Sequence, residues 1–401
     1  MSLMSVSAVS SFVKVSVFAK VLGAADFSYY AFLEIVLAYG QYAGTCGLLE
    51  GLNRQLPIYL SKAKDESAKK LAGEAAGIIG ILSISAFTLY SAIVSFLLND
   101  NAKFTESLIL CGAIAIINNF FLLYNLVLVA HQRTTLFAGI MACKNILTVS
   151  AGVLLASTFG LWGIFCAEAM VILTLTLIII FASKQIKYIR FSFHKKLLNT
   201  FKVGFPMMLG SLTTSIGRNL DRVTVAYSLG AIIFGQYSFA MIPVSGGIIC
   251  SNILIQYLTP RVCFAIGKGS SLLSQRKRID RVVLALLIGS VAFYPFFYFL
   301  TIELQKTIFS DFQLGLQLMR ILYFGGMLQI FVVYQSLLVA ANEGGMIFRQ
   351  SVYVVTFSAA LCALGFKLSA SPYIFAAIFV LTRLQASWLV VKATWKLSAT
   401  V

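Results

Sequence analysis

The residues that most invite a chemical interpretation are three charged side chains at the start of an apolar run. Arg218, Asp221 and Arg222 lie close together in the stretch "IGRNLDRVTVAYSLGAIIFGQYSFA", residues 216–240. At 100° per residue, all three fall on one side of a helix. A charge in the middle of a bilayer costs roughly 2.5–3.5 kcal/mol, so such a residue usually faces a bundle interior or water. The spacing therefore predicts a polar stripe on an otherwise apolar helix.

Other polar residues within apolar runs extend this pattern, and cations outnumber the nearby acids among them. An excess of buried cation indicates an anionic substrate, and guanidinium groups bind phosphate oxygens in bidentate fashion. A simpler alternative is that Asp221 pairs with a neighbouring arginine only to hold helices together. The candidate residues for contacts to phosphate or sugar are Arg218, Arg222, Asp221, Lys14, Lys144, Arg320 and Asn125, of which Arg218, Arg222 and Lys14 are the best. Glu34 and Glu50 are candidates for charge balance or for carrying a coupling proton.

The composition indicates the elements that must position these residues. Of the 401 residues, 59% are hydrophobic and 11% are charged, whereas an average soluble domain is about 25% charged. Apolar runs of about 20 residues, long enough to cross a hydrocarbon core of about 30 Å, recur along the whole chain. The sequence therefore predicts an all-α, multi-pass membrane protein with short connectors. The twelve predicted spans are about 2–22, 30–52, 71–97, 107–130, 136–157, 161–182, 200–228, 236–258, 282–302, 317–341, 346–367 and 372–393.

The basic residues predict the orientation of these spans. Most of the 31 Lys and Arg residues lie in the C-terminal tail and in connectors that follow even-numbered spans. An excess of Lys and Arg marks cytoplasmic loops, so both termini are expected in the cytoplasm. The net charge of +17 is thus better explained by orientation than by nucleic-acid binding. As an alternative, the basic loop at 261–281 would hold anionic lipid head groups.

Signals for catalysis, metal binding or a cofactor are absent from the sequence. The seven cysteines are scattered without a CxxC motif, and neither of the two histidines lies in an H-E-x-x-H pattern. The glycines of "GKGSS" at 267–271 do not complete a phosphate-binding loop, and no G-x-S-x-G occurs. We therefore expect no enzyme, no cofactor and no metal. Energy for any transport would come from ion or substrate gradients, or from a partner.

An internal repeat relates the two halves of the chain. The triplet Leu22-Gly23-Ala24 matches Leu229-Gly230-Ala231 at an offset of 207 residues, and "LLYNLVLVA" matches "VVYQSLLVA" at an offset of 210. Two matches at nearly the same offset predict two six-helix bundles, residues 1–190 and 191–401. Because six is even, the repeats are parallel, and parallel repeats with a substrate path at their interface are typical of transporters. We expect the polar stripes of both halves to line a shared, hydrated cavity.

Two stretches resemble a known family. "AKVLGAADFSYYAFLE", after the first span, resembles the A-R-x-L-G-x-x-x-Y/F-G-x-Y pattern of the polysaccharide transporter family. "VGFPMMLGSLTTSIGRNLDRVTVAYSLGAIIFGQYSFA", residues 203–240, is similar to the seventh-helix pattern of that family, with its D-R pair and its L-G-x-x-x-x-G-x-Y exit. The family contains the Wzx-type O-antigen flippases, within the multidrug/oligosaccharidyl-lipid/polysaccharide (MOP) superfamily.

The resemblance implies two six-helix bundles around a V-shaped cavity that alternates its access. The implied activity moves undecaprenyl-diphosphate-linked oligosaccharide repeat units from the cytoplasmic to the periplasmic leaflet of the bacterial inner membrane, for O-antigen or lipopolysaccharide synthesis. The implied partners are this lipid-linked substrate, membrane lipids, and a polysaccharide polymerase and chain-length regulator. An ion-coupled exporter of small molecules from the same superfamily is the main alternative. A membrane glycan polymerase or ligase is a weaker one, because such enzymes typically carry a large periplasmic loop and the connectors here are short.

Overall fold

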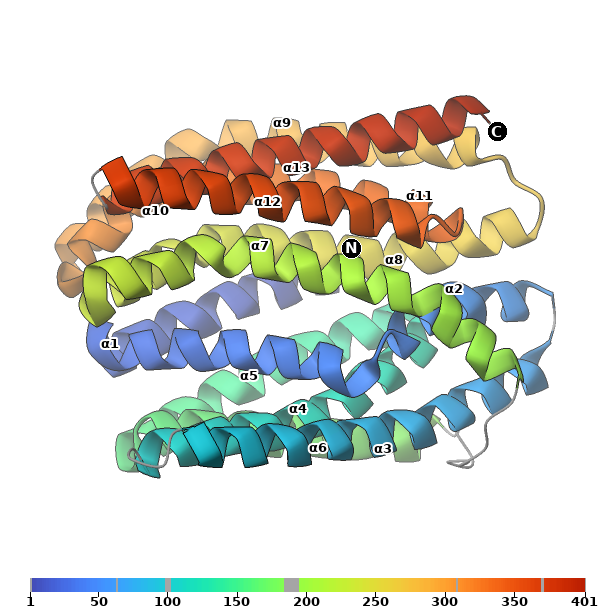
Figure 1. The fold of residues 1–401 in the computed structure, drawn as a ribbon, viewed down its shortest axis with the longest axis horizontal. Coiled ribbons are helices and arrows are strands. Elements are labelled where there is room, and N and C mark those ends of the chain that lie inside the picture. The colour runs from blue at the N-terminus through green and yellow to red at the C-terminus, as the bar shows by residue number, and fades with distance from the viewer. Residues whose placement is uncertain are drawn as a thin grey trace. The chain divides into compact units, whose positions relative to one another are not determined.

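The computed structural model describes residues 2–62, 64–97, 102–183, 195–307, 309–368 and 371–400, and every element in these ranges is a helix (Figure 1). The α-helices are α1 (Ser2–Thr45), α2 (Leu48–Ser61), α3 (Asp65–Leu97), α4 (Ala102–Ala130), α5 (Thr134–Phe159), α6 (Leu161–Ser183), α7 (Lys195–Ala240), α8 (Ile242–Gly267), α9 (Leu272–Thr307), α10 (Gln313–Leu328), α11 (Gln335–Ala340), α12 (Gly344–Leu368) and α13 (Pro372–Thr400). Two short 3-10 helices, η1 (Ser310–Phe312) and η2 (Gln329–Tyr334), flank α10.

Eleven stretches among the described residues are long and apolar enough to cross a membrane. Twelve spans were expected, and the count agrees once α1 is divided at its kink, because the first two expected spans lie before and after Gly23. With 44 residues, a straight α1 would measure about 66 Å, roughly twice the thickness of a hydrocarbon core. The all-α, multi-pass architecture is thus confirmed, whereas the V-shaped cavity and the cytoplasmic location of the termini stay predictions.

Sharp kinks divide the two longest helices at equivalent positions of the repeat. Gly23 in α1 has φ 71° and ψ 174°, and Gly230 in α7 has φ 83° and ψ 173°. This region of backbone space is essentially restricted to glycine, because a Cβ atom clashes there. The two glycines are 207 residues apart, the offset of the sequence match. The repeat predicted from the sequence is therefore also present in the backbone conformation.

A second pair of equivalent turns supports the same repeat. Gln132 after α4 and Asn342 after α11 both have positive φ, 60° and 67°, and lie 210 residues apart. Each turn is closed by the same backbone bonds: Arg133 N donates to Leu128 O, and Glu343 N donates to Leu338 O. These bonds satisfy carbonyl groups that the helix ends leave unpaired.

The described chain divides into two compact units. Unit 1 contains the described residues of Met1–Ser7, Phe32–Leu209 and Thr259–Gly269, and unit 2 contains those of Ala8–Ala31, Gly210–Leu258 and Ser270–Val401. The expected division between residues 190 and 191 stays a prediction for the repeat itself. As packing units, α1, α7 and α8 each contribute residues to both. Sequence order alone does not assign these three helices, because their contacts join residues far apart in the chain.

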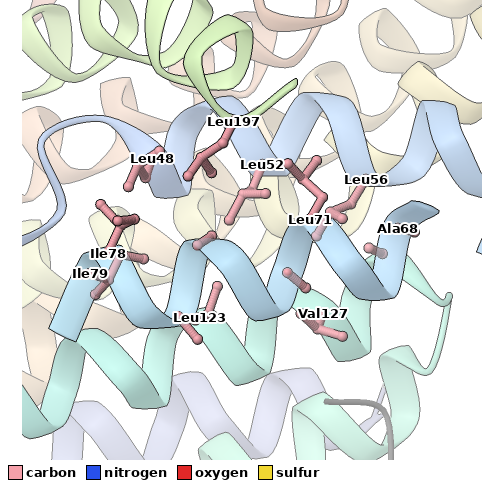
Figure 2. Packing of buried hydrophobic residues seen from close by; sticks show 14 residues of the cluster. Leu48, Leu52, Leu56, Ala68, Leu71, Ile78, Ile79, Leu123, Val127 and Leu197 are labelled. Carbon is pink, nitrogen blue, oxygen red and sulfur yellow. The ribbon is translucent and has the colours of Figure 1, made fainter. Parts of the chain in front are cut away.

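The core of unit 1 is formed by aliphatic side chains from four helices (Figure 2). Leu48, Leu52 and Leu56 recur every four residues on α2 and are almost fully buried. This spacing places them on one face of the helix, against α3 and α4. The other members of the cluster are Ala68, Leu71, Ala72, Ala75, Ala76, Ile78, Ile79, Leu123, Val127, Ala130 and Leu197.

Unit 2 contains an aromatic core near the kinks. Phe312 lies 4.3 Å from Phe239 and 6.2 Å from Phe27 between ring centroids. At Gly235, a Cβ atom would lie 2.1 Å from the carbonyl oxygen of Ala24, so only glycine allows these backbones to approach so closely. The segments that follow the two kinks thus pack directly on one another within unit 2.

Candidate functional site

The polar stripe of α7 is completed by a tyrosine from beyond the Gly230 kink. Asp221 is 2% exposed, and the hydroxyl of Tyr237 donates to its Oδ2 at 2.6 Å. Along a straight helix, residues 16 positions apart would be separated by about 24 Å. The bond therefore depends on the kink, which turns the end of α7 back toward its middle. A backbone feature that is specific to glycine builds this part of the site.

Two arginines lie close to Asp221, and a third lies close to one of them. Arg222 and Arg383 lie close enough to interact electrostatically with its carboxylate, and Arg383 in turn interacts with Arg218. Arg218 and Arg222 are partly buried, whereas Arg383 is 3% exposed. We call these four residues the arginine cluster. With three guanidinium groups and one carboxylate, the cluster carries a formal excess of positive charge.

Arg383, from α13, is the member that sequence reasoning missed. Its Nη2 donates to the carbonyl oxygen of Gly217 at 3.3 Å, and its guanidinium lies 5.1 Å from the ring centroid of Phe379. The sequence did contain a signal for Arg383, because this residue is a lone cation within an apolar span. Nothing in the sequence says which of several lone cations meets Asp221, since α7 and α13 are far apart along the chain.

Two other predicted cations also belong to unit 2. Lys14 lies on the α1 segment of this unit and is partly buried. Arg320 on α10 donates from Nε to Thr301 Oγ1 at 3.0 Å and contacts Gln305 Oε1 at 3.5 Å. Its guanidinium also lies 4.9 Å from the ring centroid of Tyr298. These contacts join α9 to α10, so Arg320 has structural partners of its own, and its role toward a substrate stays a prediction.

Two polar candidates of unit 1 both contact Phe121. Lys144 on α5 lies 5.2 Å from the Phe121 ring centroid, and Asn125 on α4 donates to the Phe121 carbonyl oxygen at 2.8 Å. The first is a cation–π contact between helices. The second is a bond within one helix turn. Neither residue lies in the same unit as the arginine cluster, and their predicted contacts to a substrate stay untested.

The two acidic candidates lie in unit 1 as well. Glu34 on α1 lies close enough to Cys111 to interact with it electrostatically. Glu50 is on α2, outside the eleven candidate spans, and its buried Oε2 has no hydrogen-bond partner among the described residues. Burial raises the pKa of the Glu50 carboxyl to about 7. The described residues contain no group of three or more metal-ligating side chains.

Unit 1 holds an apolar pocket of about 360 Å³. A short polar chain crosses one wall: Asn119 Nδ2 donates to Ser83 Oγ at 3.0 Å, and Ser83 Oγ donates to the Gly44 carbonyl at 3.2 Å. The buried Asn119 Oδ1 and Tyr90 hydroxyl have no hydrogen-bond partner among the described residues. The unit 1 pocket is lined by Val36, Tyr39, Gly40, Ala43, Ser83, Ala86, Phe87, Tyr90, Cys111, Gly112, Ala115, Ile116 and Asn119.

Unit 2 holds a much smaller and more polar cavity, of about 30 Å³. It connects the arginine cluster to α10, η2 and α12 through Arg383. We call it the unit 2 cavity. Its lining residues are Thr214, Leu328, Gln329, Val332, Gln335, Gln350, Ser351, Val354, Arg383, Ala386, Ser387 and Val390.

Comparisons with known proteins show similarity at the level of fold. No protein-family model and no curated protein matches the chain. Among solved structures, a MATE protein in complex with MaL6 aligns with a TM-score of 0.78 at 14% identity, over 99% of this chain and 94% of the other. A multidrug resistance MATE family transporter of the MOP superfamily, in an outward-facing conformation, aligns with 0.73 at 14% identity, over 99% and 96%. A MOP superfamily transporter from Pyrococcus furiosus, described as having a binding pocket of reverse polarity, aligns with 0.75 at 14% identity, over 100% and 93%.

These neighbours are transporters, and they cover almost the whole chain. At 14% identity they show a shared fold, and they do not single out the O-antigen flippases. The chain thus has the fold of the multi-pass transporters of the MOP superfamily.

Proposed function

We propose that this protein is an ion-coupled membrane transporter that exports small, largely apolar molecules. The observation that carries this proposal is the unit 1 pocket, which lies between membrane-spanning helices of a MATE-like fold. Its volume of about 360 Å³ lies in the range of drug-sized ligand sites, which are typically mostly apolar with a few fixed polar groups.

The polar atoms of the pocket define what such a substrate needs. Asn119 Oδ1 accepts a hydrogen bond, and the Tyr90 hydroxyl can donate or accept one. Both are buried without a partner among the described residues. Leaving such groups unpaired costs about 1–3 kcal/mol each, so a ligand that pairs with them gains affinity. The expected substrate therefore has an apolar body with one or two hydrogen-bonding groups.

Glu50 is the acid that best supports coupling to protons. A carboxyl whose pKa is raised to about 7 gains and loses a proton close to physiological pH. The position of Glu50 on α2, outside the candidate spans, equally fits the alternative that this residue only balances charge. Transport driven by an imposed pH gradient in wild type but not in Glu50→Gln separates these roles.

The experiment that tests export uses everted membrane vesicles and a panel of apolar fluorescent dyes. Ala86 lines the pocket from α3, so Ala86→Trp fills it, whereas Ser85→Trp adds the same bulk on an exposed position of the same helix. We expect dye accumulation in wild type and Ser85→Trp vesicles, and its loss in Ala86→Trp. Equal accumulation in both variants would contradict the proposal.

The arginine cluster favours a second candidate, a flippase for diphosphate-linked oligosaccharides. Guanidinium groups bind phosphate in bidentate geometry, and Arg218 and Arg222 are only partly buried. The similarity of residues 203–240 to polysaccharide transporters supports the same candidate. So does the neighbour described as having a pocket of reverse polarity. In this case a polymerase and a chain-length regulator would use the product.

A leaflet-resolved lipid assay separates the two candidates. In a strain that lacks the gene, the flippase predicts complete undecaprenyl-diphosphate-linked units on the cytoplasmic leaflet and loss of surface polysaccharide. Unchanged lipid-linked pools together with increased dye sensitivity support the exporter. Accumulation of single units on the periplasmic leaflet would contradict both and favour a polymerase or ligase.

A further inference from the structure

The unit 2 cavity contains two buried hydrogen-bond donors without partners. Arg383 Nε and Gln329 Nε2 are buried, line the cavity and have no hydrogen-bond partner among the described residues. Arg383 is 3% exposed and Gln329 is 2% exposed. Buried polar groups in folded proteins are nearly always paired, so two such donors in one cavity call for an acceptor.

Four other polar side chains of the cavity wall already have partners. Thr214 Oγ1 and Ser351 Oγ lie 2.7 Å apart and share a hydrogen bond. Ser387 Oγ donates to the Leu328 carbonyl oxygen at 3.0 Å, and Gln350 Nε2 donates to the Leu389 carbonyl oxygen at 3.1 Å. Arg383 Nε and Gln329 Nε2 are therefore buried donors of the wall that stay available to a ligand.

The electrostatics of the cavity favour a negative ligand over a neutral one. None of the described residues that line it is Asp or Glu, and Arg383 is its one charged side chain. Arg218 repels Arg383, and Asp221 is shared between Arg383 and Arg222. A buried charge is costly unless it is compensated. An anion in the cavity would supply the charge that Asp221 alone does not.

The volume of the cavity limits the size of that anion. About 30 Å³ holds one or two water-sized bodies, since a single water needs roughly 10–15 Å³ measured in this way. A sugar is too large. A monatomic halide, which is slightly larger than a water molecule, fits.

We propose that the unit 2 cavity is a binding site for a single halide ion, physiologically chloride, held by Arg383 Nε and Gln329 Nε2. The site is distinct from the unit 1 pocket and does not depend on which substrate is transported. By pairing with Arg383, the ion joins α13 to η2 and completes the charge balance of the arginine cluster.

The test measures the thermal stability of the purified full-length protein in sodium chloride and in sodium gluconate of equal ionic strength. A ligand that binds only the folded state raises Tm. We expect a saturable rise of about 2–4 °C with chloride in wild type. No difference between chloride and gluconate would overturn the proposal and leave the cavity to water.

Two variants show where the ion binds. Gln329→Glu places a carboxylate beside Arg383 in place of the ion, so this variant is expected to be stable in gluconate and to lose the chloride response. Arg320→Gln is the matched control, because it removes an arginine of the same unit that already has Thr301 and Gln305 as partners. It is expected to keep the response. A chloride response that survives in Gln329→Glu would show a general salt effect and overturn the proposal.

Crystals grown in bromide give an independent readout. We expect one anomalous scattering peak within hydrogen-bond distance of both Arg383 and Gln329. Ordered density there without an anomalous signal would identify a water molecule and contradict the assignment.

Discussion

The unit 1 pocket and the unit 2 cavity share one equivalent position of the repeat, yet they lie between different helices and their chemistry is opposite. Asn119 and Gln329 are 210 residues apart, and each lines the hollow of its own unit. In unit 1, Asn119 is joined through Ser83 to the carbonyl of Gly44. In unit 2, the Gln329 carbonyl accepts a bond at 2.8 Å from Ser251, which lies 207 residues after Gly44.

The difference between the pocket and the cavity comes from their positions as well as from side chains. The pocket lies between α1, α3 and α4, whereas the cavity lies between α7, α10, η2, α11, α12 and α13. Close helix contacts are kept in both units: a Cβ atom on Gly40 would lie 3.1 Å from Ala115, and one on Gly247 would lie 2.3 Å from the Gly326 carbonyl oxygen. Unit 1 fills the remaining space with apolar groups, and unit 2 fills it with arginine, glutamine and hydroxyl groups. A duplicated scaffold thus carries an apolar pocket in one unit and a polar cavity in the other.

The largest expected effect comes from removing the only carboxylate of the arginine cluster in unit 2. Asp221→Ala leaves Arg222 and Arg383 without their shared carboxylate, and removing one partner of a buried ion pair costs about 3–5 kcal/mol. We expect the purified variant to unfold at a clearly lower temperature than wild type. Glu34→Gln, an acid of unit 1, is the control and is expected to have the smaller effect. An equal loss in both variants would contradict a special role for the arginine cluster.

Tyr237→Phe tests whether the kink in α7 serves the cluster. The substitution removes the 2.6 Å hydrogen bond to Asp221, and hydrogen bonds to charged groups contribute about 1.5–3 kcal/mol. Thermal unfolding of the variant in detergent measures the loss. In the background of Asp221→Ala the same substitution is expected to cost little, and additive losses would show that the two residues act independently.

Substituting the kink glycines asks how far the two halves are equivalent. Gly23→Ala and Gly230→Ala each force a Cβ atom into a backbone region that costs about 1–3 kcal/mol. No atom outside the local helix lies within 4 Å of the place that either Cβ atom would take, so strain is the main expected cause. We expect similar losses of stability, with loss of transport from Gly230→Ala because it also displaces Tyr237. Two neutral substitutions would show that the kinks do not require glycine.

A paired substitution compares the two hollows directly. Asn119→Leu removes a bond to Ser83 and is expected to cost about 1 kcal/mol. Gln329→Leu removes a donor that has no partner among the described residues, so in halide-free buffer it is expected to be neutral or stabilising. Thermal unfolding in gluconate measures the stability of each variant relative to wild type. The reverse order of stabilities would mean that Gln329 has a partner and the two positions are alike.

The last prediction concerns pH. The pKa of Glu50 is raised from 4.5 to about 7 by burial, so the folded state binds more protons than the unfolded state between these values. The contribution of Glu50 to stability therefore falls as pH rises from about 4.5 to 7. Glu50→Gln is expected to flatten the dependence of Tm on pH in this window. An unchanged slope would show that another group titrates there.

Much of the fold was predictable because it depends on local properties of the chain. Apolar run length predicted the spans, and the offset matches around Gly23 and Gly230 predicted equivalent elements that the backbone indeed repeats. The first two expected spans correspond to the two parts of α1, which the Gly23 kink divides.

The candidate site was predictable only in part. Asp221 and Arg222 were correctly placed close together, since neighbours on one helix face meet whatever the tertiary structure is. Arg320 has partners on α9, and Lys144 lies over Phe121 in the other unit. Arg383, which was not among the candidates, joins the cluster instead. Lone cations in a sequence look alike until the packing of distant helices decides their partners.

The sequence by itself determined that this protein is helical, membrane-spanning, duplicated and marked by a polar stripe on α7. These features follow from hydrophobic run length, helical periodicity and the backbone freedom of glycine, all of which act between near neighbours in the chain. Only the tertiary structure decided that Tyr237 folds back onto Asp221, that Arg383 completes the cluster, and that one unit holds an apolar pocket and the other a polar cavity. These features depend on contacts between residues 16 to more than 160 positions apart, which no local pattern specifies.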